Sequence, residues 1–242
     1  MDRFDLSRRG VLRQACGCGL AGALAALHAP PLFAADAKKT ALTPDEALNL
    51  LKEGNKKFLA DSPVTAAVGR QRRLEIARSQ TPFAVLVSCS DSRVPPETLF
   101  GRGLGELFVV RNAGNTVDTT ALGSIEYAVA VLGVPLVVVL GHERCGAVDA
   151  ALSVVEKNAS FPGSLGPMIE PIIPAVLQAR AKSPSARGEE LLDTAVRENV
   201  IRVVARLRDS YPVLREPVRG GKLKIVGARY DLDDGNVEFL DG

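Results

Sequence analysis

Short apolar runs rich in branched residues alternate along the chain with stretches in which apolar residues recur at helical spacing. The short runs predict buried strands and occupy 83–87, 107–110 and 136–140. The helical patterns occupy 119–132, 146–155 and 191–207. Two last runs, at 223–230 and 237–240, flank a polar turn and predict a hairpin. This alternation predicts an α/β fold with a mostly parallel central sheet flanked by helices.

The remaining segments predict shorter or interrupted helices. Thr43 is a candidate N-cap and Pro44 suits the first helical position, so a helix is expected to begin there. Weaker helical patterns are seen at 70–78 and, broken by prolines, at 168–181, and the segment 94–100 is expected to form a short helix or a turn. The apolar face of the 191–207 helix is assigned to the core or to a subunit contact.

Chemically reactive side chains follow two of the predicted strands. Cys89, Asp91 and Arg93 come directly after the run at 83–87, and His142 and Cys145 follow the run at 136–140. Chemistry in open α/β sheets gathers at the carboxyl ends of the strands. We therefore expect these five residues to lie at one edge of the sheet.

Two thiolates and one imidazole form a donor set suited to tetrahedral zinc. Cys89, His142 and Cys145 would leave the fourth position open for water, and zinc makes hydroxide available near neutral pH. Asp91 would stay ionised beside Arg93 and accept a hydrogen bond from that hydroxide. Alternatively, Asp91 could swing in as a fourth ligand and close the site. The sequence thus predicts one zinc ion per chain.

Other interpretations of the same residues remain open at this point. Each cysteine could be an inert core residue, and His142 a hydrogen-bonded core histidine. Cys89 and Cys145 could also form a disulfide, which would leave no role for His142. Asp91 and Arg93 could be an ordinary surface ion pair. The occurrence of all five at two strand ends favours the metal site.

The first 37 residues resemble an export signal. Arg8 and Arg9 precede an apolar stretch at 17–27, and small residues at Ala35 and Ala37 suggest cleavage. We expect a twin-arginine signal peptide at 1–37, a single domain at 38–242, use of the twin-arginine export machinery, and a periplasmic or otherwise exported location. The other cysteines and the other histidine, at 16, 18 and 28, lie inside this segment.

Charge and hydropathy exclude some classes of partner. The formal net charge is only +2, and basic residues are not interleaved with aromatic ones, so nucleic acid is not expected as a partner. The stretch at 17–27 is too short to span a bilayer permanently, and no apolar run in 38–242 approaches membrane-spanning length.

The motifs at 89–93 and 141–146 together resemble the paired signatures of the β-class carbonic anhydrases. Stretches at 111–115, 123–129 and 226–231 match as well, and the resemblance covers roughly 42 to 240. It implies a β-carbonic anhydrase-like fold assembled as a homodimer or tetramer. It also implies reversible hydration of carbon dioxide to bicarbonate and a proton. In this reading zinc is held by Cys89, His142 and Cys145, and Asp91 with Arg93 is the orienting dyad.

The same resemblance implies a substrate pocket. Gln80, Phe108 and Tyr127 fall where the plant-like branch lines this pocket, partly from across the dimer interface, with Gln80 donating a hydrogen bond to the substrate. The backbone around Gly146 would assist. The regulated branch has a tryptophan at the position of Leu86, so an open, plant-like site is expected.

Three alternative functions remain at the level of sequence. The first is a same-fold hydrolase of carbon disulfide or carbonyl sulfide, which the motifs do not separate from a carbonic anhydrase. The second is a non-catalytic zinc-binding scaffold, which would not need Asp91, Arg93 and Gln80. The third is a thiol redox protein, which the absence of a C-x-x-C motif disfavours.

Overall fold

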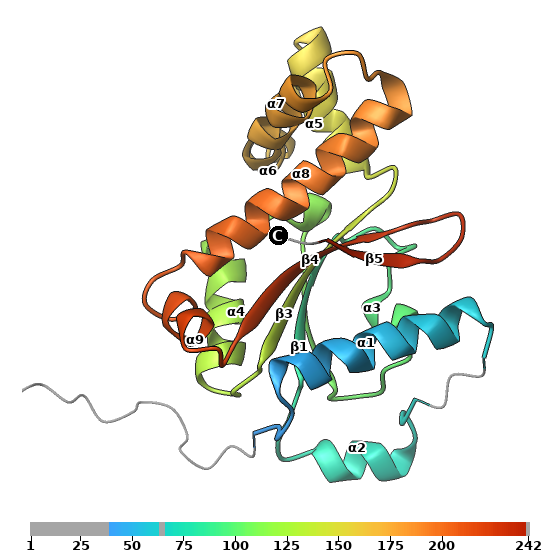
Figure 1. Cartoon of the computed structure of the whole chain (residues 1–242), viewed down its shortest axis with the longest axis vertical. Coiled ribbons are helices and arrows are strands. Elements are labelled where there is room, and N and C mark those ends of the chain that lie inside the picture. The colour runs from blue at the N-terminus through green and yellow to red at the C-terminus, as the bar shows by residue number, and fades with distance from the viewer. Residues whose placement is uncertain (1–38, 63–65, 241–242) are drawn as a thin grey trace, which may run out of the picture. The chain divides into compact units, whose positions relative to one another are not determined.

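The computed structural model describes residues 39–62 and 66–240, so the expected export signal lies outside the described residues. The described chain contains one five-stranded sheet in the order β2-β1-β3-β4-β5. The strands are β1 (Ala84–Ser88), β2 (Leu107–Arg111), β3 (Leu136–His142), β4 (Lys224–Tyr230) and β5 (Val237–Leu240). The first four are parallel and β5 runs antiparallel to β4, as Figure 1 shows. The predicted α/β fold and the C-terminal hairpin are confirmed.

Helices precede β1 and fill the connections between the four parallel strands. They are α1 (Pro44–Leu59), α2 (Arg70–Ile76), α3 (Pro96–Leu99), α4 (Thr119–Ala130), α5 (Gly146–Lys157), α6 (Leu165–Ile169), α7 (Ile173–Lys182), α8 (Gly188–Arg208) and α9 (Arg215–Arg219). The described residues also form two 3₁₀ helices, η2 (Ala113–Asn115) and η3 (Glu170–Ile172). None of the described helices is both long and apolar enough to cross a membrane.

Both faces of the sheet are covered by helices, which explains the continuously apolar strand runs. Helices α4 and α8 pack on the face that carries Val85, Val87 and Val139. Helices α1 and α3 cover the opposite face, where Leu86 and Val138 point. Figure 1 shows α1 and α8 on opposite sides of the strands. The apolar face of α8 is therefore core, one of the two roles assigned to it.

Helix α8 approaches the sheet closely over two glycines. A Cβ atom on Gly141 would lie 2.6 Å from Val200 of α8, and one on Gly227 would lie 2.7 Å from the same side chain. Contacts this short are sterically forbidden, so only glycine fits at these two positions on β3 and β4. This packing holds α8 directly over the residue that precedes His142.

The helix start expected at Thr43 is confirmed. Thr43 and Glu46 form a reciprocal capping box, and Pro44 is the first helical residue. The basic helix expected at 70–78 ends earlier, at Ile76, and none of its residues is buried. The pattern at 168–181 is divided among α6, η3 and α7, in agreement with the expected break.

Candidate metal centre

The fold brings the three predicted metal ligands together. Cys89 follows β1, His142 ends β3, and Cys145 is the N-cap residue of α5. One ligand atom from each lies within 4.8 Å of the others, and all three side chains are buried. Strands β1 and β3 pair directly, so the two motifs meet because their strands are neighbours.

The spacing of the two sulfur atoms fits a shared metal ion. Cys89 Sγ and Cys145 Sγ lie 4.0 Å apart. A disulfide bond would bring them to about 2.05 Å. Two thiolates bound to one tetrahedral zinc at about 2.3 Å lie roughly 3.8 Å apart. Both cysteines are free, so the disulfide interpretation does not describe this structure.

His142 is oriented as a metal ligand. Its Nδ1 lies 2.8 Å from the carbonyl oxygen of Glu143, which can only accept, so Nδ1 carries the proton. The other nitrogen, Nε2, is then an acceptor, and it is buried without a hydrogen-bond partner. A core histidine would leave that atom unsatisfied at a cost in free energy, whereas a metal ion would satisfy it.

The two thiols interact directly, and this interaction moves their pKa values in opposite directions. A hydrogen bond from Cys145, together with the Gly114 amide at 3.2 Å, lowers the pKa of Cys89 well below its usual range. The same hydrogen bond, burial and the charge on Cys89 raise the pKa of Cys145. Amides at the start of α5 lower it, as expected for a helix N-terminus, but they are outweighed. A metal cation would displace the remaining proton.

Asp91 is held by Arg93 through three hydrogen bonds. The guanidinium donates from Nε to Oδ1 at 3.0 Å and from Nη2 to Oδ2 at 2.8 Å. The Arg93 backbone amide adds a bond to Oδ1 at 3.0 Å. This pairing holds the pKa of Asp91 well below its usual range. Oδ2 also lies 3.9 Å from His142 Nε2, which places the carboxylate beside the ligand cluster.

Three residues support the cluster in ways that the sequence did not reveal. Arg111 donates to the carbonyl oxygens of Cys89 at 2.8 Å and of Asp91 at 2.6 Å. The Gly114 amide bonds the Cys89 sulfur, and Asn199 of α8 donates to the Gly114 carbonyl at 2.9 Å. Arg111 ends β2 and Gly114 follows it, so the signal available in the sequence was their position at the carboxyl end of a strand that neighbours β1.

The predicted substrate residues lie outside the buried cluster. Gln80 is exposed in the segment before β1. Phe108 on β2 and Tyr127 on α4 pack against each other with ring centroids 6.4 Å apart. Gly146 is the first residue of α5, and a Cβ atom there would meet nothing within 4 Å. Of the four, Gly146 alone adjoins a ligand in sequence.

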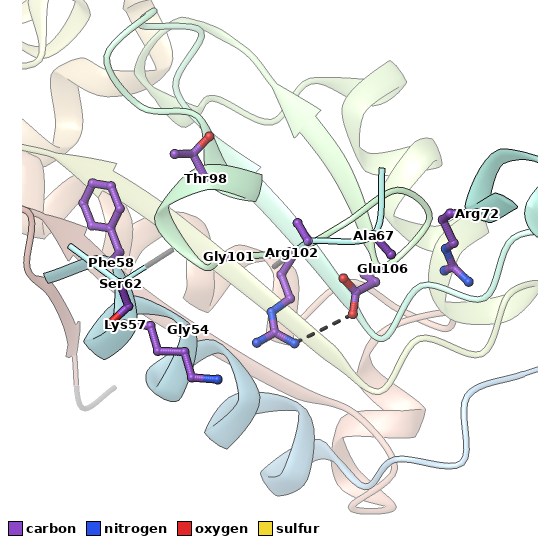
Figure 2. A pocket seen from close by; sticks show the side chains of 11 residues that line it. Gly54, Lys57, Phe58, Ser62, Ala67, Arg72, Thr98, Gly101, Arg102 and Glu106 are labelled. Atoms are coloured by element: carbon purple, nitrogen blue, oxygen red, sulfur yellow. Dashed lines mark ion pairs between the residues drawn. The ribbon is translucent and has the colours of Figure 1, made fainter. Parts of the chain in front are cut away.

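A separate cavity of about 410 Å³ lies away from the predicted site residues. Figure 2 shows its lining from α1, α2 and the segment before β2, including Lys57, Arg72, Arg102 and Glu106. Arg102 pairs with Glu106 at 3.7 Å and donates to the Phe100 carbonyl. None of the predicted site residues lines this cavity. The candidate site is therefore the cluster at the carboxyl ends of β1 and β3.

The fold and the Cys₂His donor set define an α/β metalloprotein whose ligands fit zinc. The family model described as carbonic anhydrase matches residues 84–237. Carbonic anhydrase 2 of Mycobacterium tuberculosis is 43% identical over 198 residues, covering 82% of this chain and 93% of that protein.

Solved structures agree with this assignment. The β-carbonic anhydrase of Coccomyxa, solved with acetazolamide, superposes with a TM-score of 0.63 and 30% identity over 80% of this chain and 86% of that one. A tetrameric β-carbonic anhydrase of Sordaria macrospora gives a TM-score of 0.62 and 29% identity over 70% and 85%. The chain belongs to the β-carbonic anhydrase family.

Proposed function

We propose that this protein is a zinc-dependent carbonic anhydrase that interconverts carbon dioxide and bicarbonate. The observation that carries the proposal is the buried cluster of Cys89, His142 and Cys145, in which His142 Nε2 has no partner. The ionised Asp91 beside this cluster supports a catalytic role, because a purely structural zinc site would not need a carboxylate held there.

Zinc bound by three protein ligands supplies a water nucleophile that is active near neutral pH. Asp91 would accept a hydrogen bond from that nucleophile and so set the direction of attack. Because Arg93 keeps Asp91 ionised, the carboxylate acts only as an acceptor. The backbone amide of Gly146, the first residue of α5, would assist by stabilising negative charge that develops on the substrate, while the Ala147 and Val148 amides face the Cys145 sulfur.

We also propose that the site is the open, plant-like form, in which Asp91 stays on Arg93. The three hydrogen bonds between these residues support this form, because closing the site would require Asp91 to leave its guanidinium partner. Leu86 stands where the regulated branch of the family has a tryptophan, and it is fully buried in the core. Leu86 therefore offers no indole to an inhibitory anion.

The functional unit is proposed to be a homodimer or a tetramer. Strand β2 is an edge strand of the sheet in the described chain, and Tyr127 beside it is 42% exposed. An exposed aromatic residue at a sheet edge is typical of a contact surface. A second copy of the chain packed there would bring Phe108 and Tyr127 toward a neighbouring metal centre.

Stopped-flow measurement of carbon dioxide hydration, zinc content and light-scattering mass on one purified sample tests these proposals together. We expect fast turnover, about one zinc per chain, and the mass of two or four chains. Zinc without turnover at neutral or higher pH would contradict the proposed activity, and hydrolysis of carbon disulfide on the same sample would replace it. A single-chain mass would contradict the proposed assembly.

We further propose that 1–37 is a twin-arginine signal peptide, that 38–242 is the mature domain, and that the protein is periplasmic or otherwise exported. Replacing Arg8 and Arg9 together with lysine should retain the full-length precursor in the cytoplasm, because the export machinery reads the arginine pair. Cell fractionation and N-terminal sequencing measure this. Unchanged export of the lysine variant would contradict the assignment.

A further inference from the structure

The two residues between His142 and Cys145, Glu143 and Arg144, form a tight turn that we call the ligand loop. Arg144 has a φ angle of +50°, in the left-handed region that side chains other than glycine rarely adopt. A strained residue persists only where its surroundings hold it, and such residues cluster at functional sites. The loop links two metal ligands, so its conformation decides where both lie.

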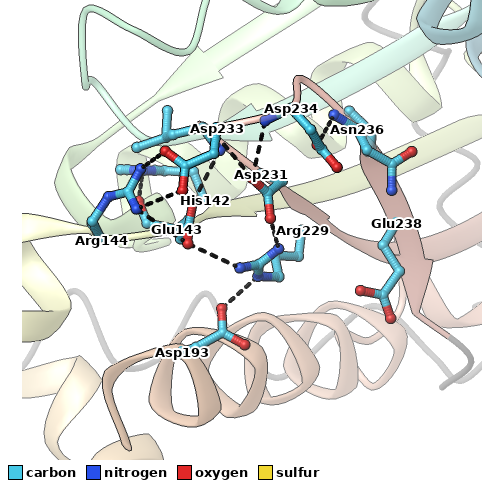
Figure 3. A network of polar contacts seen from close by, with 12 residues as sticks. His142, Glu143, Arg144, Asp193, Arg229, Asp231, Asp233, Asp234, Asn236 and Glu238 are labelled. Carbon is cyan, nitrogen blue, oxygen red and sulfur yellow. Dashed lines mark hydrogen bonds and ion pairs between the residues drawn. The ribbon is translucent and has the colours of Figure 1, made fainter. Parts of the chain in front are cut away.

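The side chain of Arg144 is fixed by a bidentate ion pair. Nη1 donates to Asp233 Oδ2 at 3.0 Å and Nη2 to Asp233 Oδ1 at 2.6 Å. Figure 3 shows this pair spanning the gap between the ligand loop and the turn between β4 and β5. The pairing raises the pKa of Arg144 and lowers that of Asp233. The Asp233 amide is itself bonded to Asp231 at 2.9 Å.

Glu143 makes a second set of contacts to the same hairpin. Its amide donates to the Tyr230 carbonyl at 2.9 Å, and its Oε2 accepts from the Leu232 amide at 3.2 Å. Its own carbonyl accepts from His142 Nδ1. Glu143 therefore links the hairpin to the imidazole ring of His142. Its backbone amide and its side chain both bind the hairpin, and its carbonyl oxygen binds the ring.

The acidic groups of this network are balanced by arginines. Glu143, Asp231 and Asp233 lie within 4.8 Å of one another. Arg229 donates to Asp231 at 2.9 Å and lies 3.7 Å from Glu143, while Arg144 binds Asp233. Each of the three carboxylates is thus paired with a guanidinium group. The cluster is best understood as a rigid connection between the hairpin and the ligand loop.

We propose that Arg144 and Asp233 are positioning residues for the metal centre. Their ion pair holds the ligand loop in its left-handed turn and thereby sets the His142 ring and the Cys145 sulfur for one metal ion. The inference rests on the zinc site proposed above. Asp233 is 70% exposed, and exposed pairs add little to global stability. Breaking the pair should therefore change the positions of His142 and Cys145, and with them the zinc affinity, more than the free energy of unfolding.

The test is the zinc dissociation constant of the whole protein, measured by competition with a chromophoric chelator. Asp233→Asn and Arg144→Ala should each raise this constant about fivefold, the upper range for the loss of an exposed bidentate ion pair. Arg144→Gly should raise it less than Arg144→Ala, because glycine adopts the left-handed turn without strain. Glu238→Gln is the matched control, since Glu238 lies on β5 of the same hairpin and forms a bidentate pair with Arg197 of α8. It should leave the constant unchanged.

The visible absorption spectrum of the cobalt(II)-substituted protein gives a second readout, because its bands report coordination geometry. Asp233→Asn should shift these bands, and Glu238→Gln should not. Zinc constants within twofold of wild type in Asp233→Asn and Arg144→Ala would overturn the proposal. Equal increases in the zinc dissociation constant for Arg144→Gly and Arg144→Ala would also overturn it. Equal increases for Glu238→Gln and Asp233→Asn would do the same. A wild-type protein that binds no zinc would overturn the metal site and this inference together.

Discussion

Replacing Cys89 with serine is expected to produce a folded protein that holds almost no zinc and has lost carbon dioxide hydration. A serine hydroxyl stays protonated near neutral pH and does not replace a thiolate as a zinc ligand. The remaining donors, His142 and Cys145, would bind the ion too weakly to retain it. Elemental analysis of the purified variant and stopped-flow hydration assays measure the two losses.

Thermal unfolding separates this result from simple misfolding. The metal-free Cys89→Ser variant should unfold within a few degrees of metal-free wild type, because the substitution is nearly isosteric. Added zinc should raise the midpoint of wild type alone, since only wild type binds the ion in its folded state. A variant that retained about one zinc per chain would remove Cys89 from the ligand set.

Replacing Asp91 with alanine is expected to leave zinc bound but to lower kcat/KM by about a hundredfold or more, in the range found for lost acid–base or electrostatic groups. The carboxylate touches the cluster only through the 3.9 Å approach of Oδ2 to His142 Nε2, so it is not needed to hold the ion. Without it, the nucleophile loses the acceptor that orients it. Stopped-flow kinetics with zinc content on the same sample measure both.

The control for this variant is Glu238→Gln, which also removes a carboxylate from a bidentate arginine pair but lies on β5, away from the ligand atoms. It should keep wild-type turnover. If Asp91→Ala kept full turnover, the orienting role would be wrong. If it lost zinc, Asp91 would be a ligand, and the site would be the closed form.

The central strands β1 and β3 could be predicted because they are buried on both faces. Such strands are continuous apolar runs, as at 83–87 and 136–140, and a run of this kind is visible without knowledge of its neighbours. The end of α2 at Ile76 could not be predicted in this way. That helix buries none of its residues in the described chain, so no apolar periodicity marks where it ends.

The metal ligands were predictable for a related reason. Cys89 and His142 stand at strand ends, and parallel neighbouring strands bring their ends together. The supporting contacts were not predictable, because they join residues far apart in the chain. Arg144 and Asp233 are 89 residues apart, and their pairing depends on the turn between β4 and β5 meeting the ligand loop. Neither charge is distinctive on its own.

The separation of the ligands along the chain affects how zinc acts on folding. Cys89 and Cys145 lie 56 residues apart, and β1 and β3 bring them together only once they are paired. Closing a loop in a disordered chain costs conformational entropy, and the part that depends on this length alone is about 3.6 kcal/mol before any metal–ligand bond is gained. Unfolded chains should therefore compete poorly for the ion. Most of the free energy of zinc binding then stabilises the native state. Zinc therefore also favours chains in which β1 and β3 are correctly paired.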